Sequence, residues 1–197
     1  MAEIYDCVKA LKNLLNVQYE FLLGHKGNLV AIQLQFHKLH FYHLMGFQYI
    51  KDVRQLNGKS EIVFDKLYNH EIKEEIILAS KQYSKISSRI KYLCFLEKIL
   101  DDNKTVFKYN KENNSFSLIQ ADFLLKNELE EKNIFVFLSK DSGNTYFCRS
   151  FFPETHTDYS KGQTNWTLLS KKKIFKREKT ETLLFVKESN SIKSYKK

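Results

Sequence analysis

The stretch IFVFLSKDSGNTYFCRS, residues 134–150, predicts two short strands joined by a turn. Its two ends, Ile134–Leu138 and Thr145–Ser150, are rich in the aromatic and β-branched residues that are enriched in strands. The segment KDSGN between them supplies the Asp, Ser, Gly and Asn residues that favour turns. A hairpin at this place indicates an antiparallel sheet in the second half of the chain.

The other segments after Asp102 extend this sheet. Four more stretches have strand composition and are separated by polar turns: Thr105–Tyr109, Ser115–Ile119, Thr164–Ser170 and Thr182–Val186. We expect the first two to pair as a second hairpin around the turn KENN.

The first half of the chain has mainly helical spacing. Apolar residues recur at intervals of three and four over residues 3–23, which predicts one helix that ends at Gly24. The other predicted elements are a strand over Asn28–Phe36, a short helix to Leu44 broken at Gly46, short helices over 60–69 and 71–80, and a longer helix over Tyr83–Asp101. Helices first and strands afterwards predict an α+β fold with N-terminal helices packed on a C-terminal antiparallel sheet.

The length of 197 residues fits one domain over residues 1–187, followed by a charged tail over 188–197. Residues 1–101 are predicted to be mainly helical with one strand, and residues 102–187 to be mainly strands. No segment resembles a signal peptide or a membrane span. Three widely spaced cysteines, Cys7, Cys94 and Cys148, fit buried free thiols in a reducing cytoplasm.

The net charge of +9 has two explanations. Clustered Lys and Arg side chains gain affinity for nucleic acid by releasing counterions, so a polyanionic partner such as RNA is one of them. The other is composition, since Lys-rich and Asn-rich chains from AT-rich bacterial or phage genomes are basic for that reason alone. No nucleotide-binding glycine loop, HExxH or GxSxG motif is present, which excludes typical NTPases, dehydrogenases and metalloproteases.

Three histidines, His37, His40 and His43, recur at three-residue intervals and share one face if the segment is helical. No Asp, Glu or Cys residue accompanies them at ligand spacing, so we predict neither a metal site nor a cofactor. They are either surface and core histidines, or one of them transfers protons, which the imidazole pKa near neutrality allows.

Other polar residues are candidates for handling phosphate. Arg89 is either an ordinary helix residue or a planar guanidinium that binds a phosphate. Ser150, Tyr159, Gln163 and Thr167 lie around one predicted connection between strands, which is either a hydrophilic loop or the edge of a site. The densest run of positive charge is either a solvated surface or a path for an RNA backbone. It consists of Lys171, Lys172, Lys173, Lys176 and Arg177, with Lys179 beside them.

Five blocks in order resemble one known family, the fourth family of phage-associated nucleases of the barnase–EndoU–colicin–RelE type. They are FYHLMGFQYIKDV (41–53), YSKISSRIKYL (83–93), FSLIQADFLL (116–125), IFVFL (134–138) and SFFPETHTDYSKGQTNWTLL (150–169). The resemblance implies a barnase/EndoU/RelE-like fold and metal-independent cleavage of RNA, including tRNA, through attack by a ribose 2′-hydroxyl that leaves a cyclic phosphate.

Carried over by position, the resemblance implies that His43 is the base or acid and Arg89 the phosphate clamp. It places Ser150, Tyr159, Gln163 and Thr167 around the scissile phosphate. One position departs from the family block: a lysine is expected where this chain has Tyr49, and the nearest cation is Lys51. Because catalytic groups must converge on one reacting atom, a nuclease would bring His43, Arg89 and Ser150 together in one cleft.

Three hypotheses follow. The chain is an RNA-cleaving, toxin-like effector of phage or mobile-element origin in which Lys51 substitutes for the family lysine. Alternatively, it is a catalytically inactive module that binds nucleic acid or inhibits a host defence complex. In the third hypothesis, the chain is an interaction protein that binds a protein partner or inhibitor, and its basic charge is only compositional.

Overall fold

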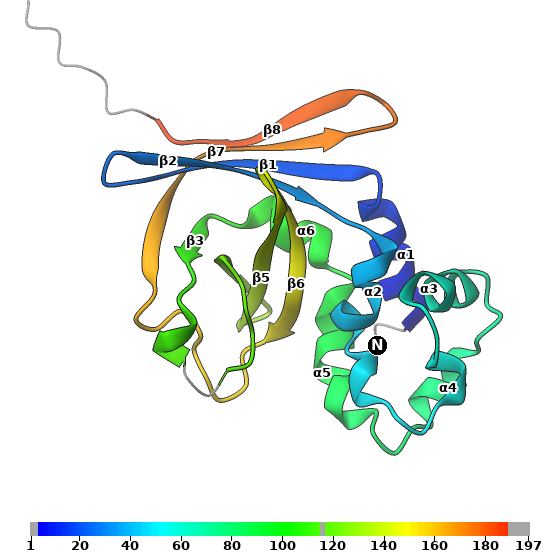
Figure 1. Ribbon diagram of the computed structural model, residues 1–197. Helices are drawn as coiled ribbons and strands as arrows, with labels where there is room; N and C mark the ends of the chain where they lie inside the picture. Colours follow the sequence, from blue (N-terminus) through cyan, green and yellow to red (C-terminus); the bar gives the residue numbers. More distant parts are fainter. Residues whose placement is uncertain (1–3, 115–116, 189–197) are drawn as a thin grey trace, which may run out of the picture.

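The computed structural model describes residues 4–114 and 117–188 (Figure 1). Its α-helices are α1 Ile4–Leu14, α2 Lys38–Met45, α3 Ser60–Tyr68, α4 Glu74–Leu78, α5 Ser84–Leu93 and α6 Leu96–Asp102. Three short 3₁₀ helices are η1 Phe47–Tyr49, η2 Arg54–Leu56 and η3 Lys111–Asn114. The strands are β1 Val17–His25, β2 Asn28–Gln35, β3 Thr105–Lys108, β4 Phe123–Leu129, β5 Lys132–Ser142, β6 Thr145–Pro153, β7 Thr164–Phe175 and β8 Thr180–Val186.

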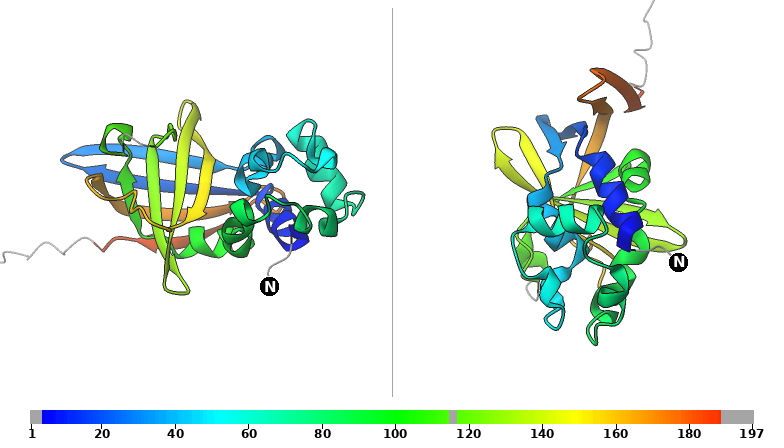
Figure 2. Two further views of the ribbon diagram at one scale, coloured as in Figure 1. Left: turned by 90° about the horizontal axis from the view of Figure 1, so that it is seen from below. Right: turned by 90° about the vertical axis from the view of Figure 1, so that its right-hand side faces the viewer.

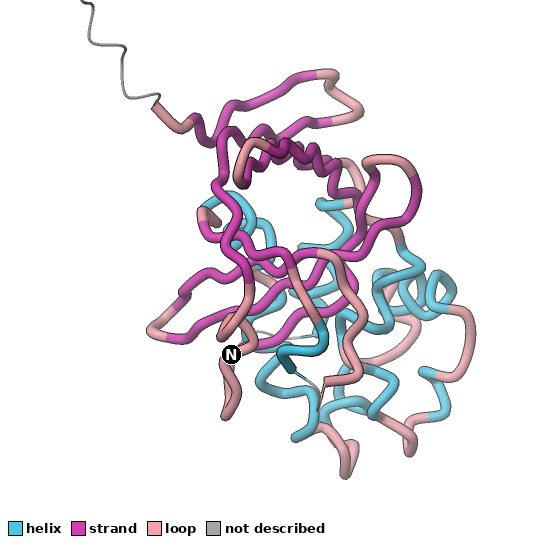
Figure 3. Tube along the Cα trace, turned by 60° about the vertical axis from the view of Figure 1, so that its left-hand side comes forward, coloured by secondary structure: helices cyan, strands magenta, loops and turns pink. Residues whose placement is uncertain are grey.

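The strands form a closed barrel. They follow the order β1-β2-β6-β5-β4-β3-β7-β8, and β1 also pairs with β7, so that seven strands close on themselves and β8 lies beside β7. The strand trace forms a ring in Figure 3. Every pairing is antiparallel except that of β2 with β6. The predicted mixture of helices and strands is confirmed, but the predicted C-terminal antiparallel sheet is in fact a closed barrel, to which two N-terminal strands contribute and in which one pairing is parallel.

The prediction of one helix over residues 3–23 is also wrong. Helix α1 ends at Leu14, and the chain then pairs as β1 with β2 on one edge and with β7 on the other. In β1 buried residues alternate with more exposed ones from Val17 to Leu23, which is the period of a strand. Pairing on both edges therefore outweighs the helical spacing of the same apolar residues.

Two other predicted elements change. The long helix over Tyr83–Asp101 is interrupted at Cys94 and Phe95, which separate α5 from α6. The predicted strand Ser115–Ile119 falls partly on residues outside the described ranges, and its described part is a loop in which Leu118 is 91% exposed. Strand β3 therefore forms its hairpin with β4 and not with residues 115–119.

Several other predicted helices and strands agree with the structure. The hairpin over residues 134–150 is confirmed as β5 and β6, and both strands are longer than expected. The short helix with a break at Gly46 and the helices near 60–69 and 71–80 are confirmed as α2, α3 and α4. Of the predicted tail, residues 189–197 lie outside the described residues.

Aromatic side chains fill the barrel interior. The Phe123 ring of β4 lies 5.8 Å from the Tyr146 ring of β6 and 6.0 Å from the Trp166 ring of β7, measured between centroids. Because neither strand is a neighbour of β4, these contacts cross the interior. The barrel is therefore a packed core, as in other small barrels.

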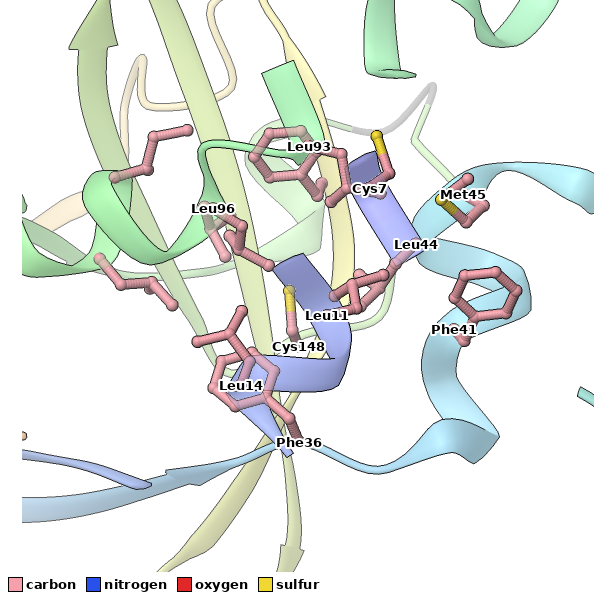
Figure 4. Close-up of a cluster of buried hydrophobic side chains, with 14 of the residues drawn as sticks. Cys7, Leu11, Leu14, Phe36, Phe41, Leu44, Met45, Leu93, Leu96 and Cys148 are labelled. Carbon is pink, nitrogen blue, oxygen red and sulfur yellow. The ribbon is translucent and has the colours of Figure 1, made fainter. Parts of the chain in front are cut away.

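The helices pack together at one side of the barrel (Figure 2). Apolar residues of α1 and α2, among them Leu11 and Leu44, gather with Cys148 of β6 in a single cluster (Figure 4). Burial raises the pKa of the Cys148 thiol to about 12, which keeps it protonated. Cys7, Cys94 and Cys148 are free thiols. No helix in the described ranges is long and apolar enough to cross a membrane.

Candidate functional site

Helix α2 presents His43 at the surface. The helix turns Phe41, Leu44 and Met45 into the core and leaves the His43 side chain exposed. It ends at Gly46, whose φ of 79° lies in the left-handed region and whose N–H donates to the His43 carbonyl over 3.1 Å. This is the usual glycine ending of a helix, and it fixes the last turn of α2.

Arg89 of α5 lies buried under that last turn. Its Nη1 donates to the His43 carbonyl oxygen over 2.8 Å and lies 3.5 Å from the Leu44 carbonyl oxygen. Its guanidinium carbon stands 5.8 Å from the centre of the Phe152 ring. These contacts join α2, α5 and β6 at a single positive charge.

That charge has no carboxylate partner. Arg89 is only 8% exposed, and it forms no ion pair with any Asp or Glu residue in the described part of the chain. Burial lowers the pKa of its guanidinium, an effect that Tyr49 and Cys148 oppose. An arginine nevertheless remains protonated at neutral pH. A buried cation balanced only by carbonyl dipoles attracts an anion.

A β-bulge in β6 places Ser150 on the same face as Phe152. Ser150 pairs with Phe137 and Cys148 pairs with Leu138, so Arg149 is the extra residue between the two pairs. Residues two apart on a strand share a face, and the half-buried Ser150 therefore lies beside the ring that contacts Arg89. Arg149 is exposed next to it.

The positive charges of Arg89 and Arg149 affect the pKa of His43. Partial burial lowers the pKa of its imidazole, and the charges of Arg149 and Arg89 lower that pKa further. At neutral pH the His43 imidazole is therefore neutral and able to accept a proton.

Tyr159 belongs to an aromatic cluster on the outer face of the barrel. Its ring lies 5.2 Å from Phe152, and 5.5 Å from both Phe135 and Phe137, between centroids. Burial raises the pKa of the Tyr159 hydroxyl, and Tyr109 and Tyr49 raise it further.

Gln163 and Lys51 have different surroundings. The Gln163 side chain is buried and binds the backbone of Asn110 at both groups: its Oε1 accepts from the N–H at 2.7 Å, and its Nε2 donates to the carbonyl at 2.9 Å. It thus holds the loop that follows β3. Lys51 is exposed, and its backbone N–H donates to Gln82. No hydrogen bond joins Lys51 to Arg89 within residues 4–114.

The basic run on β7 divides into internal and surface groups. The Lys171 ammonium is buried against the carbonyl oxygens of Leu100, Asp101 and Asn103 at the end of α6, and burial lowers its pKa to about 8. Lys173 forms ion pairs of 2.8 Å with both Glu97 and Asp101. The prediction that these two lysines follow an RNA backbone is therefore incompatible with their burial.

The other members of the run lie nearer the surface. Lys172 is paired with Glu181 over 2.8 Å, and Thr167 is half-buried on β7 beside Gly24 of β1. Lys176 and Arg177 are exposed in the turn between β7 and β8. Round the barrel, β1 and β2 lie between β7 and β6, the strand on which the helix of His43 packs. The basic run and His43 are therefore in different parts of the molecule.

A family model described as phage-Barnase-EndoU-ColicinE5/D-RelE like nuclease4 matches residues 3–188. The chain belongs to this family. The family is one of phage-associated nucleases, and the predicted resemblance is confirmed. No curated protein and no solved structure matches the chain. Membership of this nuclease family makes nucleic acid the expected class of substrate for the chain.

Sequence reasoning missed Arg149. It lies directly before the block that begins at Ser150, but the bulge that exposes it has no clear sequence signal. Phe152, whose ring contacts Arg89, lies in the sequence block 150–169, but the sequence predicted no role for it. In the described residues, no group of three or more His, Cys, Asp or Glu side chains is arranged to hold a metal ion.

The substitution Gly46→Ala tests the turn that positions Arg89. A methyl group at residue 46 would lie 2.9 Å from Ile86 Cγ2 and 3.3 Å from Arg89 Nε, and the positive φ adds strain. We expect a loss of about 2–4 kcal/mol in the free energy of unfolding. Urea denaturation measures it, with Gly27→Ala as the control, since that glycine also has a positive φ but has nothing within 4 Å of the added methyl. Equal losses in both variants would show that the contact with Arg89 and Ile86 is unimportant.

His40 makes stability depend on pH. Its ring stacks on Phe147 at 4.2 Å, and burial, with help from His37, lowers its pKa to about 4. Between pH 6.5 and 4 the unfolded chain binds more protons than the folded one, so stability falls as pH decreases through this window. We expect about 1–2 kcal/mol from this group after solvent screening. Denaturation between pH 4 and 7.5 measures it, and His40→Phe should flatten the curve; an unchanged curve would contradict the assignment.

Proposed function

We propose that this chain is a metal-independent ribonuclease that cleaves RNA through His43 and Arg89. The observation that carries the proposal is the buried guanidinium of Arg89, which lacks a carboxylate partner and is bonded to the backbone of the residue whose imidazole would transfer the proton. A phosphodiester supplies the missing negative charge and the group to be cleaved. Its ribose supplies the nucleophile.

The chemistry requires one base, one acid and a cation. The neutral imidazole of His43 accepts the proton of the 2′-hydroxyl, whose oxygen then attacks the neighbouring phosphorus. The bond from phosphorus to the 5′-oxygen breaks, leaving a 2′,3′-cyclic phosphate. Arg89 stabilises the negative charge on the nonbridging oxygens, which is largest in the transition state.

Tyr159 is our candidate for the acid that protonates the leaving 5′-oxygen. The raised pKa of its hydroxyl keeps it protonated at neutral pH, and its ring contacts Phe152, which lies beneath Arg89. Ser150 lies on the same face as Phe152 and would line the site. In this proposal Gln163 acts indirectly, by holding the loop after β3, and Lys51 contributes charge at a distance.

Exposed cations on β7 would add affinity away from the reaction. A nucleic acid can reach three members of the basic run: Lys176, Arg177 and the partly exposed side chain of Lys172. Thr167 lies on the same strand. Their removal should weaken binding without changing the chemical step.

Incubation of the purified protein with total RNA or tRNA in EDTA tests the proposal. Fragments with cyclic phosphate ends support it, and their formation in the chelator shows that no divalent metal is required. Intact RNA in the presence of folded protein would exclude it. The same mixture, analysed by a binding assay at several salt concentrations, tests whether the protein binds RNA without cleaving it.

That alternative is a module that binds nucleic acid without cleaving it. It is favoured by Tyr49, which is 46% exposed at the position where the family block has a lysine. This hypothesis predicts salt-sensitive binding that is unaffected by His43→Ala. Its action on a host defence complex would require a protein partner.

A further inference from the structure

The side chain of Arg149 is exposed, and no carboxylate in the described residues pairs with it. It occupies the bulge of β6, where two residues of that strand face one step of β5. It forms no ion pair among the residues that the structure describes. A bulge redirects a side chain from the regular pleat of the sheet, and such positions occur often beside active sites.

The charged groups around His43 are mainly positive. Arg149 acts on it from β6 and Arg89 from α5, while His40, on its own helix, is neutral at pH 7. The nearby carboxylate of Asp141 acts on His40. Two cations close to one histidine repel each other, and an anion between or beside them offsets this repulsion.

We propose that Arg149 binds a second phosphate of the same RNA strand, next to the phosphate held by Arg89. This inference rests on the ribonuclease function proposed above and specifies its substrate: an extended strand with at least two consecutive phosphates, running from α2 across the bulge of β6. A dinucleoside monophosphate has only the scissile phosphate and cannot use Arg149. The strand enters the site with its phosphates towards the protein.

The matched pair Arg149→Gln and Arg54→Gln tests the inference. Both variants lose one exposed arginine, but Arg54 lies in η2 and has no part in the site. Binding of a 2′-O-methyl RNA octamer, which cannot be cleaved, is measured between 50 and 300 mM salt. For Arg149→Gln the slope of log K against log salt should decrease by about 0.7, the value for one phosphate contact on a single strand. Arg54→Gln should match the wild type.

Two further measurements separate a phosphate contact from a structural role. The KM for an RNA octamer should increase several-fold in Arg149→Gln, with a clearly smaller penalty on a dinucleoside monophosphate, and Arg149→Lys should restore part of the loss. The pKa of His43, followed by NMR, should increase in Arg149→Gln and stay unchanged in Arg54→Gln.

The outcomes are distinct. If RNA is cleaved but Arg149→Gln behaves like Arg54→Gln in salt slope and KM, the second phosphate site is wrong and the ribonuclease stands. If no RNA is cleaved but the salt slope still decreases only in Arg149→Gln, the ribonuclease is wrong and Arg149 remains a phosphate contact. Equal penalties on the octamer and the dinucleoside monophosphate would overturn the inference.

Discussion

Replacing His43 with alanine should reduce RNA cleavage by about 10²–10⁴-fold, the usual contribution of a positioned acid or base. The substitution removes the proton acceptor and leaves the neighbouring cation in place, because Arg89 bonds to the carbonyl of His43 and not to its ring. The exposed ring contributes little to the core, so the free energy of unfolding should change by less than about 0.5 kcal/mol. Initial rates on a fluorescent RNA substrate measure the effect.

His37→Ala is the matched control for this experiment. His37 is also exposed, and it lies directly before α2, where it caps the helix only through its backbone. It should retain wild-type rates. Wild-type activity in His43→Ala would remove His43 from the mechanism, and equal losses in both variants would indicate an effect of the helix as a whole.

Replacing Arg89 with methionine should reduce cleavage by about 10²–10³-fold, the effect of removing one group that stabilises transition-state charge. Methionine fills much of the same volume beside Phe152 and Gly46. Because no buried carboxylate is left unpaired, the loss of stability is limited to the hydrogen bonds to the end of α2, about 1–2 kcal/mol.

Thermal unfolding and cleavage rates of Arg89→Met must therefore be measured together. A folded variant that has lost activity is the expected result. The control is Arg54→Met, an exposed arginine outside the site, which should be unaffected in both measurements. A folded Arg89→Met variant with normal cleavage would show that the buried charge serves only to join α2 and α5.

The sequence was most informative where local chemistry determines the structure. The turn residues of 140–144 predicted the β5–β6 hairpin, and Gly46 predicted the end of α2. The barrel was not predictable in this way, since its closure depends on pairing of β1 with β7, whose residues are about 150 positions apart. The apolar residues of β1 also fit a helical spacing, and only its partners on both edges select the strand.

The site shows the same division. His43, Arg89 and Tyr159 were proposed from a resemblance, and the structure places His43 in contact with Arg89 and Tyr159 in the aromatic cluster next to it. Spacing alone would not have joined residues on a helix, another helix and a loop. The internal position of Lys171 was equally hidden, because a lysine-rich run has the same composition whether its side chains face solvent or the end of α6.

The most direct test of the central claim is the chemistry of the products from one defined RNA oligonucleotide, compared with the same oligonucleotide carrying a single 2′-deoxy residue at the cleavage site. Mass spectrometry of the reaction in EDTA should show a 2′,3′-cyclic phosphate on the upstream fragment, and the 2′-deoxy oligonucleotide should stay intact at that site. Cleavage at the 2′-deoxy residue, or products with 3′-hydroxyl and 5′-phosphate ends, would contradict a reaction in which His43 activates the 2′-hydroxyl.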